Sequence, residues 1–119
     1  MDLKGQELIE GALRTTALKS AWDDIIAFNN KHFQSWRSLS EIYYSNAIAG
    51  EAGELCNIVK KRLGGGTKGN MPDESDMMYE LADIFIYLVL MAESKGHNEN
   101  DFAMVVMAKM EENRRRMVR

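Results

Sequence analysis

The chain has 119 residues and a hydrophobic fraction of 45%, so residues 1–119 are expected to form one domain with a core of its own. Its net charge of −3 argues against a binder of nucleic-acid polymers, because phosphate backbones attract basic surfaces. A single cysteine, Cys56, excludes an internal disulfide framework and suits the cytoplasm, and the longest apolar run, residues 84–92, is far shorter than the roughly 20 residues that span a bilayer.

Helical periodicity dominates the sequence, and the alternating pattern typical of strands is almost absent. Glycines at 64 and 96 can adopt the left-handed conformation that ends a helix. The pattern predicts four helices, which lie within residues 3–32 with an interruption near Thr15-Thr16, and over about 39–63, 73–95 and 98–117. Four long helices with short connections predict an all-α four-helix bundle.

Polar residues before three of these helices have the character of N-terminal caps. Ser38 with Glu41 forms a capping-box pattern for the second helix. The third helix is expected to be capped by Asn70 or Asp73, and the fourth by Asn98 with Asp101 three residues later.

The third helix is apolar on every side over residues 84–92. A surface helix normally keeps one polar face, so this one needs cover from several directions. A chain of this size has few further elements to supply that cover. We therefore expect a second subunit to pack here, which predicts a homo-oligomer.

Two pairs of acids interrupt otherwise apolar faces. Glu51 and Glu54 are three residues apart on the second helix, and so are Glu80 and Asp83 on the third. At that spacing both side chains of a pair project from one side of their helix. Four carboxylates near a core repel one another, so either cationic side chains or a divalent metal ion must neutralise them. Ordinary surface pairs with lysines are the alternative.

Oxygen ligands of this kind suit Mg²⁺, Mn²⁺ or Ca²⁺. A di-iron bundle is disfavoured, because neither His32 nor His97 follows a glutamate by three residues. Polar and cationic residues extend the same faces at helical spacing: Asn57 and Lys61 after Glu54, and Lys109, Asn113 and Arg116 near the end of the chain. Such residues suit a helix C-terminus, and beside a bound cation they also suit a polyphosphate.

Three segments together resemble the MazG-like all-α nucleoside triphosphate pyrophosphohydrolases. They are residues 50–61, which carry Glu51 and Glu54, residues 79–84, which carry Glu80 and Asp83, and residues 109–116. The first two segments are similar to the ExxE and ExxD signature of that family, and the third is similar to its closing K-x-x-x-N-x-x-R element. The resemblance extends from about residue 28 to residue 117.

This resemblance implies a four-helix bundle that assembles as a dimer or a dimer of dimers. It also implies Mg²⁺-dependent hydrolysis of (deoxy)nucleoside triphosphates to the monophosphate and pyrophosphate, for clean-up or adjustment of nucleotide pools, with Mn²⁺ as a substitute metal. The four acids would bind the metal, and Glu51 is our choice of catalytic base. Substrate binding would fall to Asn57, Lys60, Lys61, Tyr87, Lys109, Asn113 and Arg116, with Trp36 and His32 as contacts of the base.

Two other functions stay open at this point. The same scaffold could carry a dUTP-specific hydrolase, or the chain could be a catalytically inert, dimerising helical bundle whose acids form only salt bridges. The glycine-rich segment from Gly64 to Asn70 could fold over a triphosphate or act as a plain linker, but it lacks the spacing of a Walker P-loop.

Overall fold

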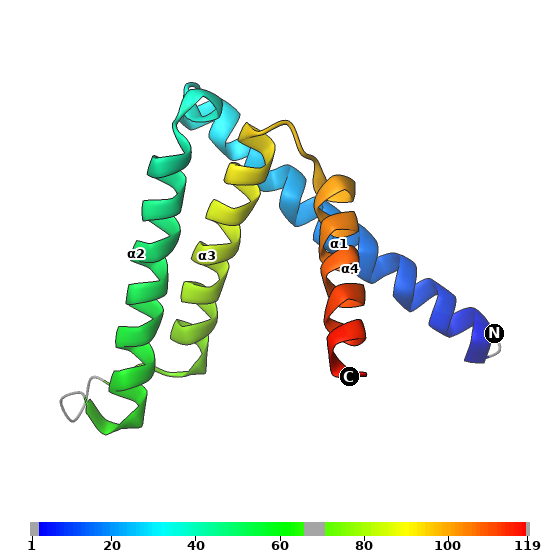
Figure 1. Cartoon of the computed structure of the whole chain (residues 1–119). Coiled ribbons are helices and arrows are strands. Elements are labelled where there is room, and N and C mark those ends of the chain that lie inside the picture. The colour runs from blue at the N-terminus through cyan, green and yellow to red at the C-terminus, as the bar shows by residue number, and fades with distance from the viewer. Residues whose placement is uncertain (1–2, 66–70, 119) are drawn as a thin grey trace. The chain divides into compact units, whose positions relative to one another are not determined.

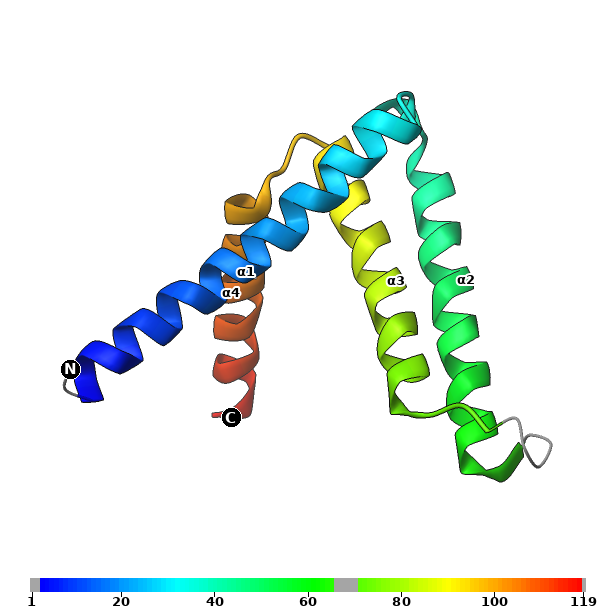
Figure 2. The ribbon, with the colours of Figure 1, turned by 180° about the vertical axis from the view of Figure 1, so that it is seen from behind.

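The computed structural model describes residues 3–65 and 71–118, and its course is shown in Figures 1 and 2. Within those residues the chain is helical and contains no strand. The elements in chain order are α1 (Leu3–His32), the 3₁₀ turn η1 (Trp36–Ser38), α2 (Glu41–Lys60), the π-helical turn η2 (Lys61–Gly65), α3 (Glu74–Ser94) and α4 (Glu99–Met117). The all-α class and the four predicted helices are therefore confirmed.

The predicted interruption of the first helix near Thr15-Thr16 is wrong. α1 runs without a break from Leu3 to His32. Two β-branched threonines lower helix propensity only slightly, and a helix of 30 residues absorbs that cost.

Capping side chains define the starts of the other helices. Asp73 and Asn98 each form a full capping box, with Asp76 and Asp101 as the reciprocal partners at 2.9–3.1 Å. The sequence predicted the pair Asn98 and Asp101, and it offered Asp73 as one of two caps for α3. The cap of α2 is Ser40, whose hydroxyl accepts a hydrogen bond from the backbone N–H of Tyr43 at 3.1 Å. The predicted cap Ser38 is wrong, because η1 includes that residue and delays the start of α2.

Two glycines have the left-handed backbone that the sequence predicted. Gly64 has φ 96° inside η2, and Gly96 has φ 85° after the end of α3. A side chain at either position would strain the backbone, so these residues fix where the two helices stop.

The described chain forms two compact units, and the first to consider is Arg37–Lys95, which contains α2 and α3. The two helices lie side by side in both views (Figures 1 and 2). Contacts at both ends show that they are antiparallel: Lys95 pairs with Glu41 at one end, and Arg62 Nη1 lies 3.2 Å from Met77 Sδ at the other. Tyr44, Val89 and Leu90 form the buried core of this helical pair.

The other unit joins Met1–Trp36 to Gly96–Arg119 and contains α1 and α4. The rings of Trp22 and Phe102 pack against each other with centroids 5.9 Å apart, and this contact joins the two helices. α4 is nevertheless largely uncovered, because Met104, Val105 and Met107 are each more than 60% exposed. That all four helices pack as one bundle in a single domain stays a prediction.

Candidate metal centre

Three of the four predicted acids meet between α2 and α3. Glu51 comes from the middle of α2, and Glu80 and Asp83 come from adjacent turns of α3. One carboxylate oxygen from each lies within 4.8 Å of the others, and all three side chains are partly buried. The antiparallel pairing of α2 and α3 brings these residues together, although they are about 30 positions apart in the sequence.

Among the residues whose side chains the structure describes, the three acids have no cationic partner, and each ion pair within 4.0 Å involves other carboxylates. Glu80 Oε2 is fully buried and has no hydrogen-bond partner. A buried carboxylate oxygen without a donor is costly, because it has lost its water and gained nothing in exchange. The negative charge of the cluster is therefore not compensated by any described side chain.

The pKa of Glu51 also indicates that the charge of the cluster is not compensated. The pKa of its carboxyl is raised first by burial and then by the negative charges of Asp83, Glu80 and Glu54. Both causes disfavour the ionised form of Glu51.

These observations test whether a metal ion fits. Three carboxylates that converge from two helices, with a buried oxygen left unsatisfied, form the hard-oxygen ligand set that Mg²⁺ and Mn²⁺ prefer. A divalent cation would relieve the repulsion and supply the missing partner of Glu80. The residues present therefore fit the metal that the sequence predicted.

Glu54 lies outside this cluster and is exposed. Residues three positions apart differ by about 60° around a helix axis, which is enough to turn Glu54 toward solvent while Glu51 faces α3. It is still close enough for its charge to raise the pKa of Glu51. Its role as a fourth ligand stays a prediction.

Three tyrosines continue the site beyond the acids. Tyr87 follows Asp83 by one turn of α3, and its pKa is raised by burial and then by Tyr43, Glu51 and Asp83. Tyr44 is fully buried, and its ring packs at nearly a right angle against that of Tyr43. Only Tyr87 was predicted as a site residue. Tyr43 precedes Glu51 by eight positions, about 2.2 turns of helix, so helical spacing alone gave no signal for it.

The predicted polar residues at the end of α2 are all exposed. Asn57 and Lys60 lie in its last turn, and Lys61 opens η2.

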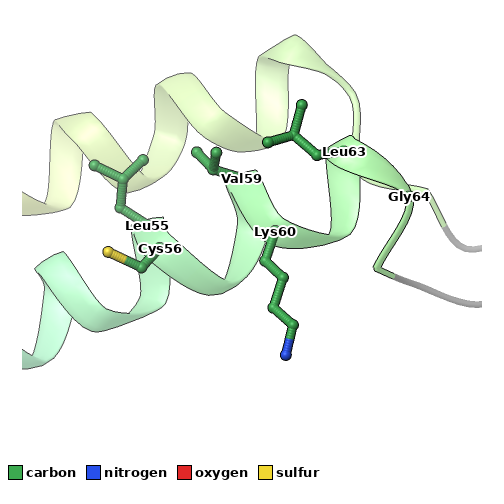
Figure 3. A pocket seen from close by; sticks show the side chains of 6 residues that line it. All are labelled: Leu55, Cys56, Val59, Lys60, Leu63 and Gly64. Carbon is green, nitrogen blue, oxygen red and sulfur yellow. The ribbon is translucent and has the colours of Figure 1, made fainter.

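Lys60 also borders an open, mainly apolar groove, which Figure 3 shows with its lining residues Leu55, Cys56, Val59, Lys60, Leu63 and Gly64. Cys56 is exposed and lines this groove.

The predicted phosphate-binding residues of α4 belong to the other unit. Lys109 Nζ lies 3.5 Å from Glu112, and Arg116 Nη2 lies 2.6 Å from the same carboxylate. Asn113 makes only a weak contact, 4.0 Å long, with the sulfur of Met110. Sequence reasoning missed Glu112, although its spacing of three and four residues from the two cations was a visible signal.

The two predicted base contacts, Trp36 and His32, also belong to that unit. Trp36 is 2% exposed, and its indole Nε1 donates to Asn30 Oδ1 at 2.9 Å. His32 is exposed, and its ring centroid lies 4.6 Å from that of Phe28. Trp36 is thus a packed residue in this structure, and the contact of either residue with a base stays a prediction.

A comparison with protein families decides what kind of domain carries this centre. The family model described as the MazG nucleotide pyrophosphohydrolase domain matches residues 40–118, more than half of the chain. The chain belongs to this family. The MazG match includes Glu51, Glu80 and Asp83 and takes in parts of both compact units. Comparisons with curated proteins and with solved structures gave no match.

Two further predictions concern a membrane span and the glycine-rich segment after α2. No helix in the described part of the MazG chain is long and apolar enough to cross a membrane. Most of the segment from Gly64 to Asn70, which we considered as a cover for a triphosphate, lies outside the described residues.

Proposed function

We propose that this MazG domain hydrolyses nucleoside triphosphates to the monophosphate and pyrophosphate, and that it depends on Mg²⁺, for which Mn²⁺ can substitute. The observation that supports this most directly is the cluster of Glu51, Glu80 and Asp83, three converging carboxylates without a cationic partner in the described residues. Membership of the MazG family supplies the reaction class.

Hydrolysis of a phosphoanhydride needs positioning and neutralisation of charge more than it needs a covalent nucleophile. A cation held by Glu51, Glu80 and Asp83 would neutralise phosphate oxygens and increase the acidity of a nearby water. Glu51 would accept the proton of the attacking water as the bond between the α- and β-phosphates breaks. Glu54, exposed at the edge of the cluster, would complete the ligand set or hold water beside it.

Cationic residues would bind the phosphate chain. Lys60 and Lys61 are exposed near the end of α2, and Lys109 and Arg116 extend from α4, with Asn57 and Asn113 as neutral hydrogen-bond donors. Lys109 and Arg116 now share Glu112, and a phosphate would compete with that carboxylate for them. Because both pairs are exposed and each is worth only about 0–1 kcal/mol, the exchange costs little.

The alternative of an inert bundle requires the acids to be neutralised by salt bridges. Among the described side chains, no ion pair includes Glu51, Glu54, Glu80 or Asp83. This observation favours the enzyme. A dUTP-specific hydrolase would use the same acids, so only the range of substrates separates the two enzymes.

The direct experiment is to incubate the full chain with each common ribo- and deoxyribonucleoside triphosphate, including dUTP, and to measure pyrophosphate release with Mg²⁺, with Mn²⁺ and with excess EDTA. We expect metal-dependent release of pyrophosphate and monophosphate in equal amounts. Release of inorganic phosphate with the diphosphate would contradict the proposed bond, and turnover of dUTP alone would establish the narrower function. No turnover in any mixture would favour the inert bundle.

We also propose that the chain works as a homo-oligomer, a dimer or a tetramer. The sequence pointed to α3 as the helix that needs cover, and α3 is partly covered by α2, with Val89 and Leu90 buried. α4 is the less covered helix, since Met104, Val105 and Met107 are each more than 60% exposed. Sedimentation equilibrium should give at least twice the chain mass of 13.5 kDa at low micromolar concentration, and a stable monomer would contradict the proposal.

A further inference from the structure

An exposed aromatic ring lies at one end of the α2–α3 pair. Tyr43 is 47% exposed, whereas the neighbouring Tyr44 is only 1% exposed. Their ring centroids are 5.3 Å apart and the rings are nearly perpendicular, at 86°. Such edge-to-face packing is favourable, so the buried ring holds the exposed one in place while much of Tyr43 stays accessible. Tyr43 is thus an aromatic ring that packs on one side and is accessible on the other.

This ring lies near the acid cluster. Tyr43 precedes Glu51 by eight residues, which corresponds to about 12 Å along α2. The pKa of Tyr87 on α3 is raised by burial and then by Tyr43, Glu51 and Asp83, so its hydroxyl is within electrostatic reach of both Tyr43 and the acids. The span from the acids to Tyr43 is comparable with the span from the phosphate chain of an extended nucleotide to its base.

The opposite end of the same helical pair has a different chemistry. Beyond Glu51 in the chain direction, α2 and η2 carry Lys60, Lys61 and Arg62, and the first two are exposed. The acids therefore lie between an aromatic end and a cationic end. A nucleoside triphosphate has the same polarity, with an aromatic base at one end and negative phosphates at the other.

We propose that Tyr43 is a nucleoside-binding residue of this site, whose ring stacks on the base of the substrate. This deepens the proposed function and rests on it. The nucleotide lies along the α2–α3 pair, with its phosphates at the acids and toward Lys60 and Lys61, and with its nucleoside toward Tyr43. Because every base has a stacking face, such a contact adds affinity with little selectivity among bases.

The test compares two substrates that differ only in the nucleoside. One is the best nucleoside triphosphate of the panel above, and the other is methyl triphosphate, which keeps the phosphate chain and lacks a base. For Tyr43→Ala we expect kcat/KM on the nucleotide to fall by about 10-fold or more, mainly through KM, with no change on methyl triphosphate. Tyr43→Phe should stay close to the wild type, because the ring remains.

A matched control is Tyr79→Ala. Tyr79 is also an exposed tyrosine, at 72%, but it precedes Asp83 by one turn and thus lies on the other side of the acids from Tyr87. We expect it to leave the ratio of the two activities unchanged. Equal losses on both substrates for Tyr43→Ala, no loss on either, or a Tyr43→Phe variant as weak as Tyr43→Ala would overturn the proposal. Sedimentation and thermal melting of each variant would show whether an equal loss comes from assembly or folding.

A second measurement separates this inference from the proposed function. The non-hydrolysable α,β-methylene analogues of the four common ribonucleoside triphosphates can be titrated calorimetrically into the wild type and Tyr43→Ala with Mg²⁺ present. Weaker binding to the variant by about 10-fold supports the stacking contact even if the wild type fails to hydrolyse nucleotides. Equal binding to both proteins, or no binding to the wild type, overturns it.

Discussion

The charged residues of α2 and α3 differ from those of α4 in one respect that matters for function. Glu51, Glu80 and Asp83 face one another without a cationic partner in the described residues. The cations Lys109 and Arg116 already have a partner in Glu112 of their own helix. The acids thus show by themselves that something positive is missing, whereas the cations of α4 are satisfied without a ligand.

The energies behind these two arrangements are also different. An exposed pair at the spacing of Lys109, Glu112 and Arg116 is worth about 0.3–0.5 kcal/mol, so it forms and breaks easily. Converging carboxylates repel one another and destabilise the fold unless a cation is bound between them. A cluster that is costly without its ligand is therefore stronger evidence of a site than a row of paired charges.

The largest expected effect comes from removing one charge of the acid cluster. Asp83→Asn or Glu80→Gln keeps the shape of the side chain but gives up a charged ligand, so we expect pyrophosphate release to fall by at least about 100-fold. The fold should persist, because the change also relieves repulsion. Steady-state kinetics with Mg²⁺, beside circular dichroism, would measure both.

The control for that experiment is Glu74→Gln, an exposed acid in the first turn of the same helix and outside the cluster. It should keep activity close to the wild type. If Asp83→Asn retained wild-type turnover, the acid cluster would not be required for hydrolysis. The acids would then be no stronger evidence of a site than the paired charges of α4.

The next prediction concerns α4, where the lower bound of the expected effect is smaller. Lys109→Ala and Arg116→Ala should each lower kcat/KM on the order of 10- to 1000-fold, the range for removal of a charge-stabilising contact. The matched control is Arg114→Ala, because Arg114 forms a similar pair with Glu111 at 3.1 Å but occupies a variable position of the MazG-like closing element. Glu112→Gln should lower KM modestly, since it frees both cations for phosphate.

This α4 prediction is checked by comparing kcat/KM of the four variants on one substrate. Similar losses for Arg114→Ala and Arg116→Ala would mean that only general positive charge matters. Unchanged kcat/KM in Lys109→Ala and Arg116→Ala would remove α4 from the site and leave the α2–α3 pair as the whole of it.

The smallest effect concerns stability without metal. The pKa of Glu51 is raised in the folded protein, so the folded state favours its protonated form. Stability from this group is fully present below the pKa of the unfolded chain and is lost as pH rises through the folded pKa. At neutral pH and in EDTA, Glu51→Gln should therefore melt a few degrees above the wild type, and the gain should vanish at acid pH. A variant that melts below the wild type at neutral pH would show that the charged Glu51 is satisfied.

Much of the fold could be predicted from sequence because its signals are local. The helix ends at Gly64 and Gly96 follow from backbone freedom, and the capping boxes at Asp73 and Asn98 depend on residues three positions apart. Ser38 was a wrong cap because the 3₁₀ turn that begins at the buried Trp36 uses it, and that turn has no clear sequence signature.

The candidate site could be predicted where helix periodicity alone determines which face of a helix a residue lies on. Spacing placed Glu51, Glu80 and Asp83 on inward faces, and the structure brings these three together. Spacing alone did not show that Glu54 turns outward, because a difference of about 60° around α2 is decided by how α3 packs. The pairing of Lys109 and Arg116 with Glu112 was likewise visible only as a spacing, since rotamers decide which neighbour a long side chain meets.

The measurement that tests the account most directly is a titration of the protein with Mn²⁺, followed by the electron paramagnetic resonance signal of the free ion. The wild type should remove free Mn²⁺ from solution in the absence of nucleotide, Glu74→Gln should do the same, and Asp83→Asn should bind far more weakly. Excess Mg²⁺ should return the Mn²⁺ to solution. Equal binding by the wild type and Asp83→Asn, or no binding by either, would contradict the claim that Glu51, Glu80 and Asp83 form a metal centre.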